Sequence, residues 1–211
     1  MNQNDLSYDI LKEMFNISVG KAASMLSEII NKRIVLDVPS VEILNPENQN
    51  VEIEESFIKV AGGALMVSSI DFGDKITGEA NLIFPANKMR RFINLCMDVG
   101  DEKDEPDMDF TDMDFDIIRE IGNIILNSIV GGMGNFLNTS LKYTLPKVKV
   151  YHRIDFAKNI KKKKHLCMLI LYITFIIDDT EIEGAVIIDL TLNSLNELME
   201  LIKKAEDDLN G

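Results

Sequence analysis

One short pattern, Asp-x3-Glu-x2-Asn, occurs twice in this chain of 211 residues, and this duplication most constrains its fold. The two copies consist of Asp9, Glu13 and Asn16, and of Asp116, Glu120 and Asn123. In both copies 22 residues separate the asparagine from a proline, which is Pro39 in the first and Pro146 in the second. Self-similarity at a fixed spacing indicates a duplicated structural unit.

The similarity between the two halves continues beyond these motifs. KITGEANLIFPANKMRRFINLC, from Lys75, resembles EIEGAVIIDLTLNSLNELMELI, from Glu181. We therefore expect a single domain over residues 1–211, made of two repeats at about 5–98 and 109–208. The acidic segment between them, residues 98–116, is interpreted as a solvated connector. It lacks the glycine and the terminal glutamate of an EF-hand calcium loop.

Hydrophobic periodicity predicts that each half begins with a long helix. Apolar residues recur at spacings of three and four from Leu6 to Ile30, and again from Ile117 to Ile129. Both helices are apolar over much of their circumference, so they should be largely buried. Closing helices are expected near Asn87–Met97 and Asn193–Lys204, which gives each half the order helix, strand, strand, strand, helix.

The predicted strands are short runs rich in β-branched residues. They are RIVLDV, SFIKVAG, ALMVSSI and GEANLIF in the first half, and KVKVYHRIDF and LCMLILYITFII in the second. Pro39 marks a strand edge or a bulge. The polar segment Lys158–Lys164 is expected to form a long hairpin turn between the last two runs. A basic binding patch is the alternative for its lysines.

Composition and charge limit the classes of function. The formal net charge of −13 disfavours nucleic acid and anionic membranes, and it suits either a partner with a basic docking face or solubility alone. Cys96 and Cys167 lie in apolar runs and are expected in the core. His152 and His165 have no cysteine at metal-ligand spacing, so no metal site is predicted. The N-terminus is polar and no apolar run could span a bilayer as a helix, which favours a cytoplasmic protein.

The duplicated motif suggests chemistry because its three residues share one helix face. A solvent-facing stripe would explain one copy, but not the same asparagine at the same place twice. Neither motif contains a histidine or cysteine that could act as a nucleophile. An asparagine amide can orient a water molecule, and an aspartyl phosphate is already activated and needs little more. A glutamate suits an ion pair with a cationic partner group.

At these residues the sequence resembles the CheC/CheX/FliY family of bacterial chemotaxis phosphatases. The family pattern is Asp or Ser, x3, Glu, x2, Asn, then x21 or x22 to Pro, and the chain matches it twice. The resemblance spans nearly the whole chain and is strongest to the CheC type. It implies an α/β fold of two pseudo-two-fold halves, in which long motif-bearing helices pack on an antiparallel β-sheet.

The resemblance also implies a function, namely hydrolysis of the aspartyl phosphate of a CheY-like response regulator. In the family the asparagine orients the attacking water and the glutamate pairs with a lysine of the regulator. The corresponding residues are Asn16 and Asn123 for the first role, and Glu13 and Glu120 for the second. Asp9 and Asp116 are expected at the partner contact, and the regulator supplies the magnesium ion. The deamidase CheD is a further expected partner.

Two alternatives to the phosphatase stay open. One is a non-catalytic adaptor that binds CheD or a phosphorylated regulator, and a flagellar switch component is a weaker third possibility. The two sites also differ in sequence, because the family often has glycine before the asparagine. Gly122 keeps that feature, whereas Phe15 replaces it and either crowds the regulator or faces the core. This difference favours the second site. Asn127, one turn beyond Asn123, either hydrates the site or caps the polar stripe.

Overall fold

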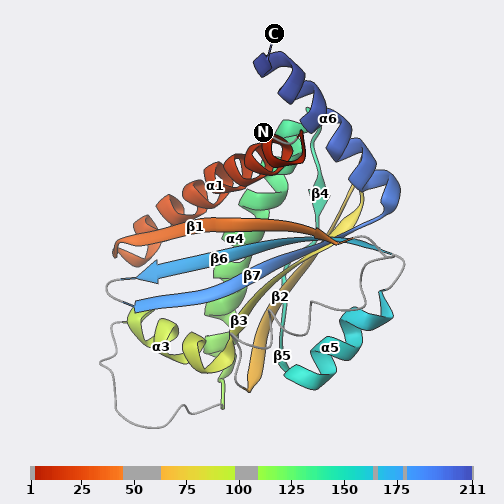
Figure 1. Ribbon diagram of the computed structural model, residues 1–211. Helices are drawn as coiled ribbons and strands as arrows, with labels where there is room; N and C mark the ends of the chain where they lie inside the picture. The colour runs from red at the N-terminus through yellow and green to blue at the C-terminus, as the bar shows by residue number, and fades with distance from the viewer. Residues whose placement is uncertain (1–2, 45–62, 98–108, 164–165, 178–179, 211) are drawn as a thin grey trace.

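The computed structural model describes residues 3–44, 63–97, 109–163, 166–177 and 180–210 (Figure 1). The strand predicted at SFIKVAG and most of the acidic connector lie outside these residues. The helices are α1 (Gln3–Ile30), α3 (Ala86–Cys96), α4 (Asp112–Phe136), α5 (Arg153–Lys162) and α6 (Leu192–Asn210). The strands are β1 (Ile34–Leu44), β2 (Ala64–Gly73), β3 (Gly78–Pro85), β4 (Lys142–Tyr143), β5 (Lys147–His152), β6 (Cys167–Ile177) and β7 (Thr180–Leu190).

The strands form one antiparallel sheet in which the two halves of the sequence interleave. The order is β1-β6-β7-β3-β2, and the far edge of β2 pairs with both β4 and β5. The central strands β3 and β7 pair with each other, and Asn81 lies opposite Ile187, which is its equivalent in the second repeat. A pseudo-two-fold axis therefore passes between these two strands. On either side, β1 of the first half pairs with β6 of the second, and β5 of the second pairs with β2 of the first. The predicted α/β fold with an antiparallel sheet and long motif helices is confirmed.

The two repeated prolines mark equivalent irregularities at opposite edges of this sheet. The register of β1 against β6 shifts between Asp37 and Ser40, which places Pro39 at the irregularity. In the second half, Pro146 falls in the gap between β4 and β5. Proline has no backbone N–H to donate to a ladder, so a break or bulge is expected where it occurs. The predicted bulge at Pro39 is confirmed.

The hairpin turn predicted at Lys158–Lys164 is wrong. Helix α5 begins at Arg153, and the strands on either side of it are not partners, because β5 pairs with β2 while β6 lies between β1 and β7. The strand alternation ends at His152. Phe156 and Ile160, four residues apart, then share a helix face and pack against the sheet.

The helices divide unequally between the two faces of the sheet (Figure 1). A large core joins α1, α3, α4 and α6 to one face. On the opposite face α5 covers a smaller cluster built from Leu65, Val67, Ile83, Met168, Ile170 and Ile187. Because both faces are covered, the run from Ala185 to Leu190 in β7 is buried without alternation. Cys167 is buried, Cys96 is partly buried, and both are free thiols.

Candidate functional site

The first motif copy lies on α1, and its asparagine is bonded to the neighbouring strand. Asp9 and Glu13 are exposed, while Asn16 is half-buried. The Asn16 Oδ1 accepts a hydrogen bond from the backbone N–H of Val38 at 2.8 Å, and its Nδ2 donates to the Val38 carbonyl at 3.2 Å. Val38 immediately precedes Pro39, where the β1 register is shifted. The side chain of Asn16 therefore completes the backbone hydrogen bonding of β1 and fastens α1 to the sheet.

The second copy lies on α4, and its asparagine has a different environment. Asp116 and Glu120 are exposed, and Asn123 is half-buried. The Asn123 Oδ1 accepts from Nδ2 of Asn127 at 2.8 Å. Among the described residues, no group accepts a hydrogen bond from Nδ2 of Asn123. Leu145, which corresponds to Val38 in the repeat, is 81% exposed. The Nδ2 of Asn123 thus keeps both of its N–H donors, whereas Asn16 has used one of its two.

Asn127 contacts the candidate site directly. Its amide fixes the orientation of Asn123, because residues four apart on a helix lie one above the other. The Oδ1 of Asn127 is buried and has no hydrogen-bond partner among the described residues. Asn127 therefore orients the side chain of Asn123.

The residues that precede the two asparagines have opposite packing roles. Phe15 is fully buried in the core, so it does not crowd the approach to Asn16. Gly122 is also buried, and a Cβ built there would lie 2.2 Å from Oγ and 2.7 Å from Cβ of Ser68 on β2. Such distances are far below van der Waals contact, so glycine allows α4 to approach β2 closely. The glycine seen in the sequence is explained by packing of the helix that carries Asn123.

The start of α4 is held by a charged cap. Thr111 is the N-cap residue, and its hydroxyl and the carboxylate of Asp114 form a reciprocal capping box. Asp114 Oδ2 also accepts from Arg90 of α3 at 2.8 Å. Burial raises the pKa of the Asp114 carboxyl, but hydrogen bonds from Thr111 and Arg90 outweigh burial and hold it below its usual range. The Thr-x-x-Asp string that encodes this cap is readable in the sequence and is a signal for the start of α4.

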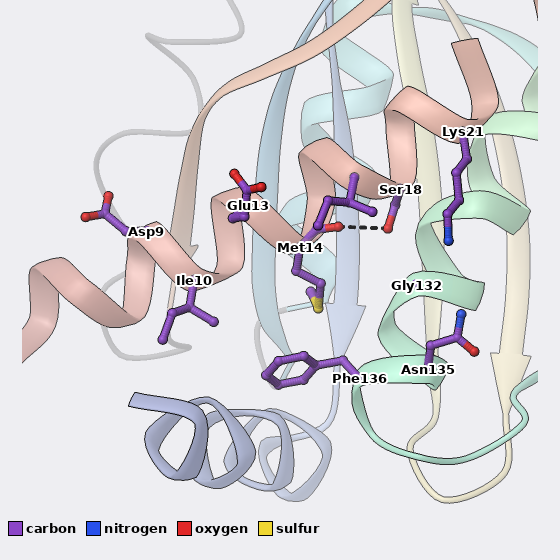
Figure 2. A pocket seen from close by; sticks show the side chains of 10 residues that line it. Asp9, Ile10, Glu13, Met14, Ser18, Lys21, Gly132, Asn135 and Phe136 are labelled. Atoms are coloured by element: carbon purple, nitrogen blue, oxygen red, sulfur yellow. Dashed lines mark hydrogen bonds between the residues drawn. The ribbon is translucent and has the colours of Figure 1, made fainter. Parts of the chain in front are cut away.

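A groove of about 610 Å³ lies beside the first motif copy, between α1 and the end of α4 (Figure 2). Asp9 and Glu13 line it toward one end, and Lys21 and Asn135 toward the other. Ile10, Met14, Ile17 and Phe136 contribute its apolar surface. Asn16 does not line the groove, because its amide is directed to β1. Glu13 and Asn16 consequently face different surroundings.

Two further features of the described residues concern metal ions and membranes. Within the described residues, no group of three or more histidine, cysteine, aspartate or glutamate side chains is arranged to hold a metal ion. In the same residues, no helix is both long and apolar enough to cross a membrane.

Comparison with known proteins shows which proteins this chain resembles. The model of the CheC-like family matches residues 6–43, which contain the first motif copy and nearly all of β1. The CheY-P phosphatase CheC of Bacillus subtilis (strain 168) is 28% identical over 150 residues, which cover 67% of this chain and 65% of that protein. The aligned part thus spans slightly less than two thirds of that relative.

Solved structures agree at the level of the fold. FliY of Thermotoga maritima superposes with a TM-score of 0.75 at 17% identity, covering 97% of this chain and 99% of that one. The FliM middle domain from H. pylori gives a TM-score of 0.60 at 9% identity, covering 95% of this chain and 99% of that one. The family match and the CheC alignment confirm the resemblance to the CheC/CheX/FliY family, and the FliY structure confirms the fold.

Proposed function

We propose that this chain hydrolyses the aspartyl phosphate of a CheY-like response regulator, and that Glu120 and Asn123 carry the activity. The observation that supports this assignment is the free donor capacity of the Asn123 amide, beside an exposed Glu120 on the same helix. Asn16 is instead bonded to both backbone groups of Val38. A relative that is named a CheY-P phosphatase supports the reaction class.

The proposed chemistry needs a positioned water molecule and little else. Water attacks the phosphorus in line with the bond to the regulator's aspartate, that P–O bond breaks, and the carboxylate leaves with its electron pair. The Oδ1 of Asn123 has a second acceptor position for a hydrogen of this water, and Nδ2 can donate to a phosphoryl oxygen. Asn127 holds the amide plane in place, which reduces the entropic cost of orienting the water. The proton of the water leaves with the phosphate product.

Glu120 supplies recognition in this proposal. It is exposed, so it can form an ion pair with a lysine of the regulator and fix the register of docking. The formal net charge of −13 favours approach to a basic surface. The magnesium ion that neutralises the phosphoryl oxygens is brought by the regulator and is not held by this chain. Asp116 forms an ion pair with Arg119, so it borders the contact with its charge partly satisfied.

The first copy suggests a different role, which is binding without turnover. Glu13 and Asp9 line an apolar groove, while the asparagine needed for water is engaged by β1. We therefore assign the first copy to partner contact, either with the regulator or with a CheD deamidase. An adaptor that binds without hydrolysis is the alternative function for the whole chain, and it rests on this copy alone.

The decisive experiment measures how fast a phosphorylated CheY-like regulator decays in the presence of substoichiometric protein. Asn123→Ala should lower kcat/KM about 100- to 1,000-fold, the usual cost of removing one precisely placed hydrogen-bonding group. Asn16→Ala, checked by circular dichroism to be folded, is the matched control and should stay within a few-fold of the wild type. Equal activity of Asn123→Ala and the wild type would overturn the proposal. Protection or decay seen only at stoichiometric amounts would favour the adaptor.

A further inference from the structure

Three large apolar side chains are exposed along the sheet edge formed by β4 and β5. They are Tyr143, Leu145 and Val150, which are 48%, 81% and 39% exposed, and we refer to them as the edge strip. Tyr143 lies opposite Phe72 and Val150 lies opposite Met66, and both of these partners are buried in the core beneath the motif helices. Side chains directly opposite each other in an antiparallel pair share a face of the sheet. Tyr143 and Val150 therefore lie on the face that carries α4.

The equivalent positions in the first half of the chain are buried. Counted back from the repeated prolines, Tyr143 and Leu145 correspond to Leu36 and Val38. Leu36 is 6% exposed and Val38 is fully buried, because α1 packs along β1. In the second half α4 makes only limited contact with β5. A surface that a motif helix covers in one repeat is thus open to solvent in the other.

Strand β5 has the side-chain pattern of a strand with one buried face. Lys147 and Lys149 point to the side of the sheet that α5 covers, since Lys149 lies opposite Val67 of the cluster beneath that helix. Val148 and Val150 alternate with them and face the side of α4, the opposite face (Figure 1). Such alternation is typical of a strand whose apolar side is packed. Exposed apolar residues that gather in one place mark an interaction site, whereas single ones do not.

The edge strip adjoins the second motif copy. A Cβ built on Gly122 would lie 2.7 Å from the Cβ of Ser68, so α4 rests on β2 at the residue before Asn123. Val148 of β5 lies opposite Ser68 on the next strand, and neighbouring strands are about 4.8 Å apart. The edge strip continues from Val148 in both directions, at about 3.3 Å per residue. It is therefore the next surface beyond Asn123 on this side of α4.

We propose that the edge strip, with Leu145 as its most exposed residue, is part of the docking surface for the phosphorylated response regulator. The inference rests on the proposed role of Asn123. A specific interface covers roughly 800 Å² of each partner, so a regulator whose phosphoaspartate reaches Asn123 extends over the neighbouring edge of the sheet. Its docking face must then present apolar side chains beside the lysine that pairs with Glu120. Because the first half buries the equivalent residues, this surface directs the regulator to the second site.

The test separates docking from chemistry at Leu145. Steady-state decay of the phosphorylated regulator gives kcat and KM, and titration with the beryllofluoride-activated regulator gives a Kd that does not depend on turnover. Leu145→Ser should raise KM and Kd about 10-fold and leave kcat within about two-fold, because the side chain contacts the partner and not the reacting atoms. Ile154→Ser is the matched control. Ile154 is 69% exposed on α5, across the sheet, and its substitution should change neither constant.

Each of the other outcomes has a definite meaning. Unchanged KM and Kd in Leu145→Ser would contradict the docking surface even if the wild type hydrolyses the phosphate. A fall in kcat at unchanged Kd would also contradict it, since Leu145 would then support the site and not the partner. Self-association of the wild type that Leu145→Ser abolishes, measured by sedimentation equilibrium, would assign the edge strip to a second copy of the chain. Absence of hydrolysis by the wild type would overturn the proposed function instead, and the Kd values would still decide the role of Leu145.

Discussion

Helices α1 and α4 carry the same Asp, Glu and Asn spacing, but the strands that follow them differ. Strand β1 continues across its proline with a shifted register, and the backbone of Val38 faces Asn16 there. In the second half the strand is interrupted at the equivalent proline, between β4 and β5, and the side chain of Leu145 is exposed to solvent. The comparison shows that the same side chain becomes a structural clamp or a free hydrogen-bonding group according to the strand beside it.

Closing helices also differ in how they hold the two motif helices. The start of α4 is tied to α3 through the ion pair between Asp114 and Arg90. At the equivalent position of α1, the hydroxyl of Ser7 donates to Glu206 of α6 at 3.1 Å. Each motif helix is thus fastened to a closing helix from the other half of the sequence, which follows the interleaving of the strands.

The largest effect that would sharpen the comparison is expected at Phe15. Phe15→Ala should lower the free energy of unfolding by about 3–5 kcal/mol, because it removes a fully buried ring and leaves a cavity. Urea denaturation measures this directly. A loss below about 1 kcal/mol would mean that the ring is not packed as described, and that it is available to contact a partner near Asn16.

Removing each asparagine tests whether only the first one is structural. Asn16→Ala should cost about 1–3 kcal/mol of stability, because the N–H and C=O of Val38 both lose their partner. Asn123→Ala removes a single side-chain hydrogen bond, from the half-buried Asn127, and should cost less than about 1 kcal/mol. Thermal or urea unfolding of both variants gives the comparison. Equal losses would break the proposed division of roles.

Substitution of Gly122 should have a smaller effect on stability, and Gly131 on the same helix provides a control. Gly122→Ala should cost about 1–2 kcal/mol, since overpacking against Ser68 exceeds the gain in helix propensity. Gly131→Ala, on the same helix with no atom within 4 Å of the added Cβ, should instead stabilise the protein slightly. Adding Ser68→Gly to Gly122→Ala should recover part of the loss, and a double-mutant cycle measures this coupling. Additive losses would show that the contact with Ser68 is not the cause.

The sequence predicted the parts of the fold that depend on local pattern. The duplicated motif, the helix from Leu6 to Ile30 and the irregularity at Pro39 all follow from periodicity or from the chemistry of proline. Helix α5 could not be predicted in this way, because its few apolar residues are recognisable as one helix face only once they are seen to pack against the sheet. The clamp from Asn16 to Val38 was also not predictable, since it depends on which backbone groups the register shift leaves unpaired.

The smallest effect is the pH dependence of the cap on α4. The pKa of Asp114 is lowered in the folded state, so its contribution to stability is fully present above its unfolded pKa, about 3.9. This contribution is lost as the pH falls through the lower folded value, because protonation removes the bonds to Arg90 and Thr111. At neutral pH, Asp114→Asn should cost about 1 kcal/mol, typical of a lost cap.

Urea denaturation from about pH 7 to about pH 3 measures this dependence across the relevant range. The loss of stability toward acid should be smaller in Asp114→Asn than in the wild type, because the variant has no carboxylate to protonate there. Asp112→Asn, which removes an exposed charge from the first turn of α4 without touching Arg90, should keep the wild-type slope. Parallel slopes for Asp114→Asn and the wild type would mean that Arg90 does not anchor α4. The charged cap would then not distinguish α4 from α1, whose start is held by the neutral hydroxyl of Ser7.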